Sequence, residues 1–166
     1  MKTILIAFVF IFLTAGAALS QVITFGVGAD VTFPTADFQN LVSTGYGATA
    51  LAKFGILPIV DLTGGVEYLS FSGKSITVDN QTGDATSSAI GVVLGGRVNF
   101  LVMCYAGLEG GTYSFTTKFP GMEDNKITYG FYSPMVGVKL AAFDLAARYV
   151  VAGESKFWGL RGMIWF

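Results

Sequence analysis

Residues 156–166 read Lys-Phe-Trp-Gly-Leu-Arg-Gly-Met-Ile-Trp-Phe, and they are the last eleven residues of the sequence. In a β-strand, alternate side chains point to opposite faces. From Trp158 to Phe166, one face would carry no charge, whereas the other would carry a single cation, Arg161, in its middle. A terminal strand with a wholly apolar face would be an aggregation-prone edge in a soluble protein. The pattern therefore indicates a strand that closes a barrel and turns its apolar face to lipid.

The composition limits the classes of protein that this chain can belong to. Of its 166 residues, 52% are hydrophobic and only 13% are charged, which is about half the charged fraction of an ordinary soluble domain. The formal net charge of −1 gives no electrostatic basis for binding nucleic acid. Histidine is absent, which removes the commonest general base and metal ligand. Cys104 is the only cysteine, so no disulfide framework exists.

Residues 1–20 have the pattern of a secretory signal peptide. Lys2 gives a positive start, residues 4–13 form an apolar stretch, and Ala18-Leu19-Ser20 is a small-x-small cleavage site. The apolar stretch is shorter than the about 20 residues of a membrane-spanning helix, and no such run follows it. We therefore expect one mature domain, residues 21–166, without a membrane helix.

The mature chain predicts eight strands. Alternating patterns occur in residues 22–31, 45–54, 60–71, 87–100, 103–115, 127–141, 144–151 and 156–166. Long polar connections fall at 33–43, 73–86 and 116–126, and short turns separate the other strands. Pro134 interrupts the sixth strand, where it needs a bulge or an edge position. Long loops at one end and short turns at the other are typical of an all-β, eight-stranded antiparallel up-and-down transmembrane β-barrel.

The charged residues decide which face of these strands points inward. Ten charged residues within the predicted strands fall on the same face, five acids and five bases. They are Asp30, Lys53, Asp61, Glu67, Arg97, Glu109, Lys139, Asp144, Arg148 and Arg161. A soluble barrel would turn this face to water, but it has few charges for a soluble exterior. If it faced lipid, each base at the bilayer midplane would cost about 2–4 kcal/mol. We therefore predict an interior ion-pair network with a structural role, and a charge-free face toward lipid.

Aromatic residues on the charge-free face gather at its two ends. Phe54, Phe100 and Phe166 lie toward the short turns, and Tyr46, Tyr68, Tyr149 and Trp158 lie toward the loops. They predict two girdles at the membrane interfaces.

The loop acids Asp79, Asp84, Glu123 and Asp124 match no EF-hand spacing. We predict neither a metal site nor a cofactor.

The signal at 1–20, the eight alternating strands of 22–166 and the terminal Ile164-Trp165-Phe166 together resemble a known group of proteins. This group is the small eight-stranded outer-membrane β-barrels of Gram-negative bacteria, which are porin-like or similar to the OmpX and OmpA barrels. The resemblance implies a place in the cell outer membrane, in contact with its lipids. It also implies that Phe166 belongs to a signal that the barrel-assembly machinery reads. The resemblance is architectural, so it does not by itself specify a function.

Three classes of function remain open. An eight-stranded interior is just wide enough for side chains to fill it, so the favoured prediction is a non-enzymatic barrel that presents loops 33–43, 73–86 and 116–126 to an extracellular ligand. Its interior would be plugged by the ion pairs and by Tyr105, Tyr113, Tyr129, Phe131 and Trp165.

The alternative is a narrow channel or transporter for small or hydrophobic solutes. Inward-facing glycines would leave room for such a passage, namely Gly26, Gly28, Gly45, Gly47, Gly107 and Gly111. An enzyme is the least favoured class, because without histidine the base would have to be Asp30, Glu67 or Glu109. Each of these is explained more simply as a member of the ion network.

Overall fold

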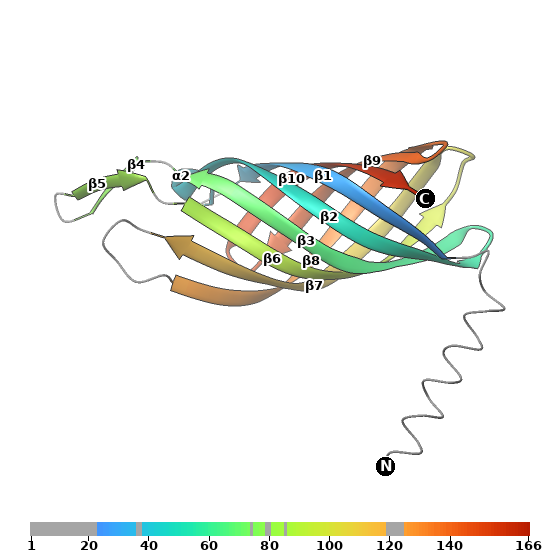
Figure 1. Ribbon diagram of the computed structural model, residues 1–166, viewed down its shortest axis with the longest axis horizontal. Coiled ribbons are helices and arrows are strands. Elements are labelled where there is room, and N and C mark those ends of the chain that lie inside the picture. Colours follow the sequence, from blue (N-terminus) through green and yellow to red (C-terminus); the bar gives the residue numbers. More distant parts are fainter. Residues whose placement is uncertain (1–22, 36–37, 74, 79–80, 85, 119–124) are drawn as a thin grey trace, which may run out of the picture.

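A computed structural model describes residues 23–35, 38–73, 75–78, 81–84, 86–118 and 125–166. The predicted signal peptide at 1–20 lies outside these ranges. Among the residues described, no helix is long and apolar enough to cross a membrane. Nearly all of this part of the chain is β-strand (Figure 1).

Eight antiparallel strands close into a barrel, which confirms the predicted fold class (Figure 1). They are β1 (Ile23–Thr35), β2 (Val42–Leu57), β3 (Val60–Gly73), β6 (Thr86–Asn99), β7 (Cys104–Lys118), β8 (Asn125–Leu140), β9 (Phe143–Ala152) and β10 (Ser155–Trp165). Each strand pairs with its neighbours along the chain, and β1 pairs with β10 to complete the ring. In this closing pair, Asp30 lies opposite Arg161. A closed ring leaves no edge strand with unpaired backbone groups.

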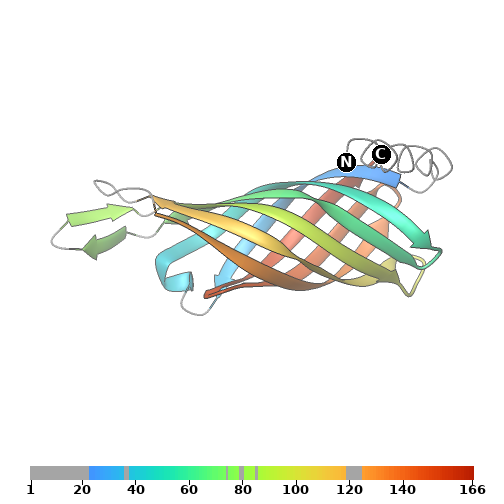
Figure 2. The same cartoon turned by 90° about the horizontal axis from the view of Figure 1, so that it is seen from below.

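The two ends of the barrel differ. At the turn end, short connections join β2 to β3, β6 to β7, and β8 to β9. The loop end lies opposite and carries a separate two-stranded hairpin of β4 (Ser75–Val78) and β5 (Gln81–Asp84). Figures 1 and 2 show this hairpin beyond the barrel, at the far end from the C-terminus. The segment at 73–86 was predicted only as a polar surface loop, and the structure adds to this that residues within it pair with one another.

The other two predicted loops are also shorter than expected. In the 33–43 segment, β1 continues to Thr35 and a short helix, α2 (Phe38–Leu41), precedes β2. The short helix forms there because it carries Phe38, whose side chain is buried. The polar residues around Phe38 did not indicate this burial. In the 116–126 segment, β7 and β8 continue to a pair between Thr117 and Asn125, because backbone pairing tolerates these polar residues. Residues 119–124 lie outside the described ranges.

Burial alternates along the strands with the predicted period of two. In β10, for example, Phe157, Arg161 and Trp165 are buried, whereas Trp158 and Leu160 are exposed. The charge-free outer face holds along the middle of the barrel. At the loop end it needs a correction, because three lysines lie at outward positions there: Lys118 and Lys126 in strands longer than predicted, and Lys156 at the start of the predicted last strand. These positions pair with Thr86, Thr116 and Thr35, where polar residues follow the apolar belt.

Pro134 lies in the middle of β8 without a shift in register. Its pairing with β7 is continuous, and it lies opposite Leu108. Its pairing with β9 is interrupted, since the partners on either side are Tyr132 with Val151 and Met135 with Arg148. Instead of the expected bulge, the pairing between β8 and β9 is interrupted at Pro134, because proline has no N–H to donate.

Candidate functional site

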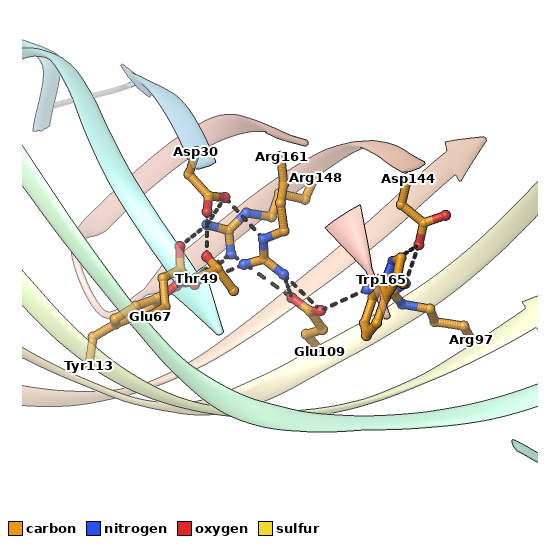
Figure 3. Close-up of polar contacts among 10 residues, drawn as sticks. All are labelled: Asp30, Thr49, Glu67, Arg97, Glu109, Tyr113, Asp144, Arg148, Arg161 and Trp165. Carbon is orange, nitrogen blue, oxygen red and sulfur yellow. Dashed lines mark hydrogen bonds and ion pairs between the residues drawn. The ribbon is translucent and has the colours of Figure 1, made fainter. Parts of the chain in front are cut away.

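Five charged side chains meet in the middle of the bore, and we call them the ion cluster. They are Asp30 of β1, Glu67 of β3, Glu109 of β7, Arg148 of β9 and Arg161 of β10 (Figure 3). Each of these side chains is at most 2% exposed. Strand alternation explains why they point inward, and barrel closure brings together residues up to 131 positions apart in the sequence.

Arg161 contacts all three carboxylates of the ion cluster. Its Nε donates to Asp30 Oδ1 at 3.0 Å, and its Nη2 donates to Glu67 Oε2 at 2.9 Å. Its Nη1 lies 3.0 and 2.9 Å from the two oxygens of Glu109. Such charge-assisted bonds fix both the position and the orientation of the guanidinium group.

Arg148 lies beside Arg161 and binds two of the same carboxylates. Its Nη2 donates to Asp30 Oδ1 at 2.9 Å, and its Nη1 donates to Glu67 Oε2 at 3.0 Å. A second bond joins Nη2 to Glu67 Oε1. Two neutral groups complete the shell, since Tyr113 donates to Glu67 at 2.7 Å and Thr49 donates to Asp30. Every carboxylate of the ion cluster is therefore engaged by at least one arginine.

A second group of contacts continues toward the turn end. Arg97 Nη1 donates to Asp144 Oδ2 at 2.9 Å, and Trp165 Nε1 donates to the same oxygen at 2.9 Å. Arg97 Nη2 also lies 3.9 Å from Glu109 Oε1. Three buried arginines therefore lie among four buried carboxylates, which are Asp30, Glu67, Glu109 and Asp144.

A third group lies at the turn-end mouth of the bore. Asp61 accepts bonds from Lys139 Nζ at 3.1 Å and from Asn99 Nδ2 at 3.2 Å. The ammonium of Lys53 lies 4.3 Å from the centre of a Trp165 ring, which is within the range of a cation–π contact. Among the described residues, Lys53 has no ion pair within 4.0 Å.

The structure thus places the ten sequence-predicted charged residues on the inner face, in three groups along the bore. Nine of them take part in ion pairs, and Lys53 instead lies over an indole ring. Sequence reasoning did not identify Thr49, Asn99 or the hydrogen-bonding role of Trp165. All three have side chains that can form hydrogen bonds, and the alternation of the strands places them inward. These two features could have identified them from the sequence.

Aromatic side chains fill the bore between the ion cluster and the loop end. The ring of Phe38, from α2, packs edge-on against Phe71 with centroids 5.2 Å apart, and lies 6.3 Å from Phe115. Tyr113 and Phe131 have centroids 4.3 Å apart. The inward positions predicted for Tyr105, Tyr113, Phe131 and Trp165 are all buried, and Tyr129 is half-buried.

The inward glycines lie against large side chains. A methyl group added at Gly26 would lie 2.6 Å from a Trp165 ring atom, and one at Gly45 would lie 2.6 Å from a Phe71 ring atom. The equivalent positions at Gly28, Gly47 and Gly107 meet side-chain atoms of Met163, Leu69 and Arg97, and that at Gly111 meets the backbone of Val92. These glycines therefore accommodate neighbouring groups, which reduces the support for a passage along them.

The predicted interfacial aromatics lie on the outer face. Tyr46, Tyr68, Phe100, Trp158 and Phe166 are exposed, and Phe54 and Tyr149 are partly buried. The rings of Tyr149 and Trp158 lie 4.9 Å apart at the loop end. The backbone of Phe166 exchanges two hydrogen bonds with Phe25, at 3.1 and 2.9 Å. Its role as an assembly signal stays a prediction.

The chemistry of this interior is that of a buried network of ion pairs. A general base needs an available lone pair close to substrate, but the ion-cluster carboxylates are buried and bonded to arginines. Within the described ranges, no group of three or more Asp, Glu or Cys side chains is arranged to hold a metal ion. Asp79, Glu123 and Asp124 lie outside those ranges, and no side-chain geometry is described for Asp84.

Comparison with known proteins identifies the fold. No family model matches the sequence, and no curated protein matches it. Among solved structures, the chain is similar to the attachment invasion locus protein Ail of Yersinia pestis, with 12% identity, a TM-score of 0.63, and coverage of 86% of this chain and 96% of Ail.

Two further solved structures have the same architecture. The N-terminal β-barrel domain of Pseudomonas aeruginosa OprF matches at 10% identity and a TM-score of 0.58, covering 86% of this chain and 97% of that domain. Neisserial surface protein A matches at 12% identity and a TM-score of 0.53, covering 86% and 95% of the two chains. These likenesses show that the chain has the fold of the eight-stranded outer-membrane β-barrels.

Proposed function

We propose that this chain is an integral protein of the Gram-negative outer membrane, exported by the signal at 1–20. Two observations support this location. The fold is that of eight-stranded outer-membrane barrels, and the outer face between the barrel ends is apolar. Leu94, Val92 and Ile90, for example, are 67%, 55% and 62% exposed along one strand. An apolar belt of this kind is stable against lipid and costly against water.

We further propose that the barrel is non-enzymatic and that its bore is plugged. The observation that carries this proposal is the ion cluster, whose side chains from five strands meet in the middle of the bore with almost no exposure. Opening it would require buried ion pairs to separate, which costs several kcal/mol for each uncompensated charge. The aromatic rings between the ion cluster and the loop end add a second barrier to passage through the bore.

In this function the outside of the barrel and its loop end carry the interactions. Outer-membrane lipids would surround the apolar belt, and the terminal strand with Phe166 would engage the barrel-assembly machinery. The segments at 33–43, 73–86 and 116–126 would meet an extracellular ligand. Support for such a role comes from the β4–β5 hairpin and from the ends of β7 and β8 at the loop end.

The alternative is a narrow channel or transporter for small or hydrophobic solutes. Its main support in the sequence was the set of inward glycines. Large side chains lie against most of those glycines in the structure, so the alternative has less support than the plugged barrel.

Conductance in a planar lipid bilayer tests the plug. We expect the wild-type barrel to show no steady current, because the ion cluster occupies the bore. An Arg161→Ala variant removes a large buried side chain and its four hydrogen bonds to three carboxylates, so we expect it to show more frequent openings. Lys126→Ala, at an exposed site of the loop end, is the matched control and should behave as the wild type. A stable, ion-selective current through the wild-type protein would contradict the proposal.

A further inference from the structure

The three connections at the turn end contain no polar side chain. We call them the apolar turns, and they are residues 56–59, 100–103 and 140–143, which read Ile-Leu-Pro-Ile, Phe-Leu-Val-Met and Leu-Ala-Ala-Phe. All twelve residues are exposed. Val102 is 99% exposed, Leu101 64% and Leu57 59%. Turns that project into water are normally rich in Gly, Asn, Asp and Ser, so these three need another explanation.

The loop end of the same barrel has the opposite character. There the outer positions of the strands carry Ser72, Thr86, Lys118 and Lys126. At the turn end, by contrast, the apolar belt continues into the turns through Leu62 and Val98, which are 46% and 48% exposed. The nearby polar residues Asp61, Asn99 and Lys139 bind one another at the mouth of the bore rather than facing outward.

Several backbone carbonyls of the apolar turns accept internal hydrogen bonds. The carbonyl of Ile59 accepts from Asn99 N–H at 2.8 Å, and the carbonyl of Met103 accepts from Lys139 N–H at 2.6 Å. The carbonyl of Leu101 accepts from Cys104 N–H at 3.3 Å, and that of Ala142 accepts from Trp165 N–H at 2.8 Å. Internal bonding of backbone groups is the condition that a lipid environment imposes, because lipid chains offer no hydrogen bonds.

From these observations we infer that the apolar turns are embedded in the phospholipid leaflet at the turn end, instead of projecting from the membrane into water. This inference rests on the proposed membrane location. The occupant is lipid because the turns continue the lipid-facing belt without a polar boundary. A protein partner would be expected to meet a polar rim around an apolar centre, and the twelve turn residues supply no polar side chain for one.

Site-directed fluorescence quenching tests this placement. The variants are Val102→Cys at the tip of an apolar turn, Leu94→Cys in the middle of the belt, and Ser72→Cys at the loop end, each in a Cys104→Ala background. Each variant is labelled with an environment-sensitive dye and refolded into phosphatidylcholine vesicles. Quenching is measured with spin-labelled phospholipid and, separately, with aqueous iodide present on both sides of the bilayer.

We expect the label at position 102 to lose fluorescence with spin-labelled lipid, as the label at 94 does, and to resist iodide. The label at 72 should be quenched by iodide. If iodide quenches the label at 102 as strongly as that at 72, the inference is wrong, although lipid quenching at 94 would still support the membrane location. If the label at 102 is shielded from both quenchers, a protein surface covers the turns and the inference is again wrong. If lipid does not quench the label at 94, the proposed membrane location itself fails.

Discussion

The buried arginines of the bore differ in how many partners depend on them. Arg148 and Arg161 each bind both Asp30 and Glu67, so the loss of either arginine leaves these carboxylates with fewer cations in a site that water does not reach. Breaking one side of a buried ion pair costs about 3–5 kcal/mol, mostly because the remaining charge is uncompensated. The network is therefore more sensitive to the removal of one charge than to the removal of a matched pair.

Arg148→Met tests this sensitivity. Methionine keeps much of the side-chain length but removes the charge, so we expect the free energy of unfolding to fall by about 3–5 kcal/mol. The measurement is urea-induced unfolding in phosphatidylcholine vesicles, followed by tryptophan fluorescence. Adding Glu67→Gln to the same chain should cost less than the sum of the two single changes, because the second change removes a charge that the first left unpaired.

Lys126→Met is the matched control for the arginine variant. Lys126 is exposed at the loop end, and surface changes of this kind usually alter stability by no more than about 0.5 kcal/mol. If Arg148→Met were as mild as this control, the ion cluster would contribute little to the folded state. The assignment of a structural role to the network would then be wrong.

At the level of the strand, glycines on the two faces serve different purposes. Gly137 of β8 points inward, and a methyl group there would lie 2.4 Å from the ring of Tyr105. Gly162 of β10 points outward, and nothing lies within 4 Å of the equivalent position. The first glycine makes room for an aromatic ring in a narrow bore, whereas the second leaves open space on the outer face.

The pair Gly137→Ala and Gly162→Ala tests this difference between the faces. Forcing an extra methyl group into a well-packed interior typically costs about 1–3 kcal/mol, so we expect Gly137→Ala to lower the free energy of unfolding by this amount. Gly162→Ala should be neutral or stabilising by up to about 1 kcal/mol, because alanine restricts the unfolded chain. Unfolding in urea measures both variants. Equal effects would mean that the two positions do not lie on opposite faces.

The alternation of apolar and small or polar residues was enough to predict the strands. It did not predict where the strands end or the structure of the segments that connect them. In β6, Ile90, Val92 and Leu94 alternate with Gly91, Val93 and Gly95, and this period of two located the strand. The charge of Arg97 on the second face then identified the lipid-facing side. Phe38 was assigned to a polar loop, because its burial depends on Phe71 and Phe115, which are distant in the sequence. Local polarity therefore overestimated the loops at 33–43, 73–86 and 116–126, because strands, a short helix and a hairpin extend into these segments.

The candidate site was predictable in its members but not in its contacts. The period of two placed the charged residues on one face, and a closed barrel turned that face inward. Which acid meets which base depends on the register between strands, such as Asp30 opposite Arg161 in the closing pair. That register is set by the whole ring. The bond from Trp165 to Asp144 could not be predicted for the same reason.

For the whole molecule, the governing feature is the sorting of charge between bore and belt. Leu94 and Arg97 lie three residues apart on β6, yet Leu94 is 67% exposed and Arg97 is 1% exposed. If water surrounded the barrel, an arginine at position 94 would be an ordinary surface change of no more than about 0.5 kcal/mol. If lipid surrounds it, the same arginine near the midplane costs about 2–4 kcal/mol. The two environments therefore predict different effects for one substitution.

Leu94→Arg is thus expected to lower the free energy of unfolding in phosphatidylcholine vesicles by about 2–4 kcal/mol. Thr128→Arg, at an exposed outer position of β8 near the loop end, is the matched control and should stay within about 0.5 kcal/mol of the wild type. Transfer into detergent micelles should shrink the cost of Leu94→Arg, because a micelle admits water to the belt more readily than a bilayer does. A Leu94→Arg barrel as stable as the Thr128→Arg control in vesicles would show that the belt does not contact lipid.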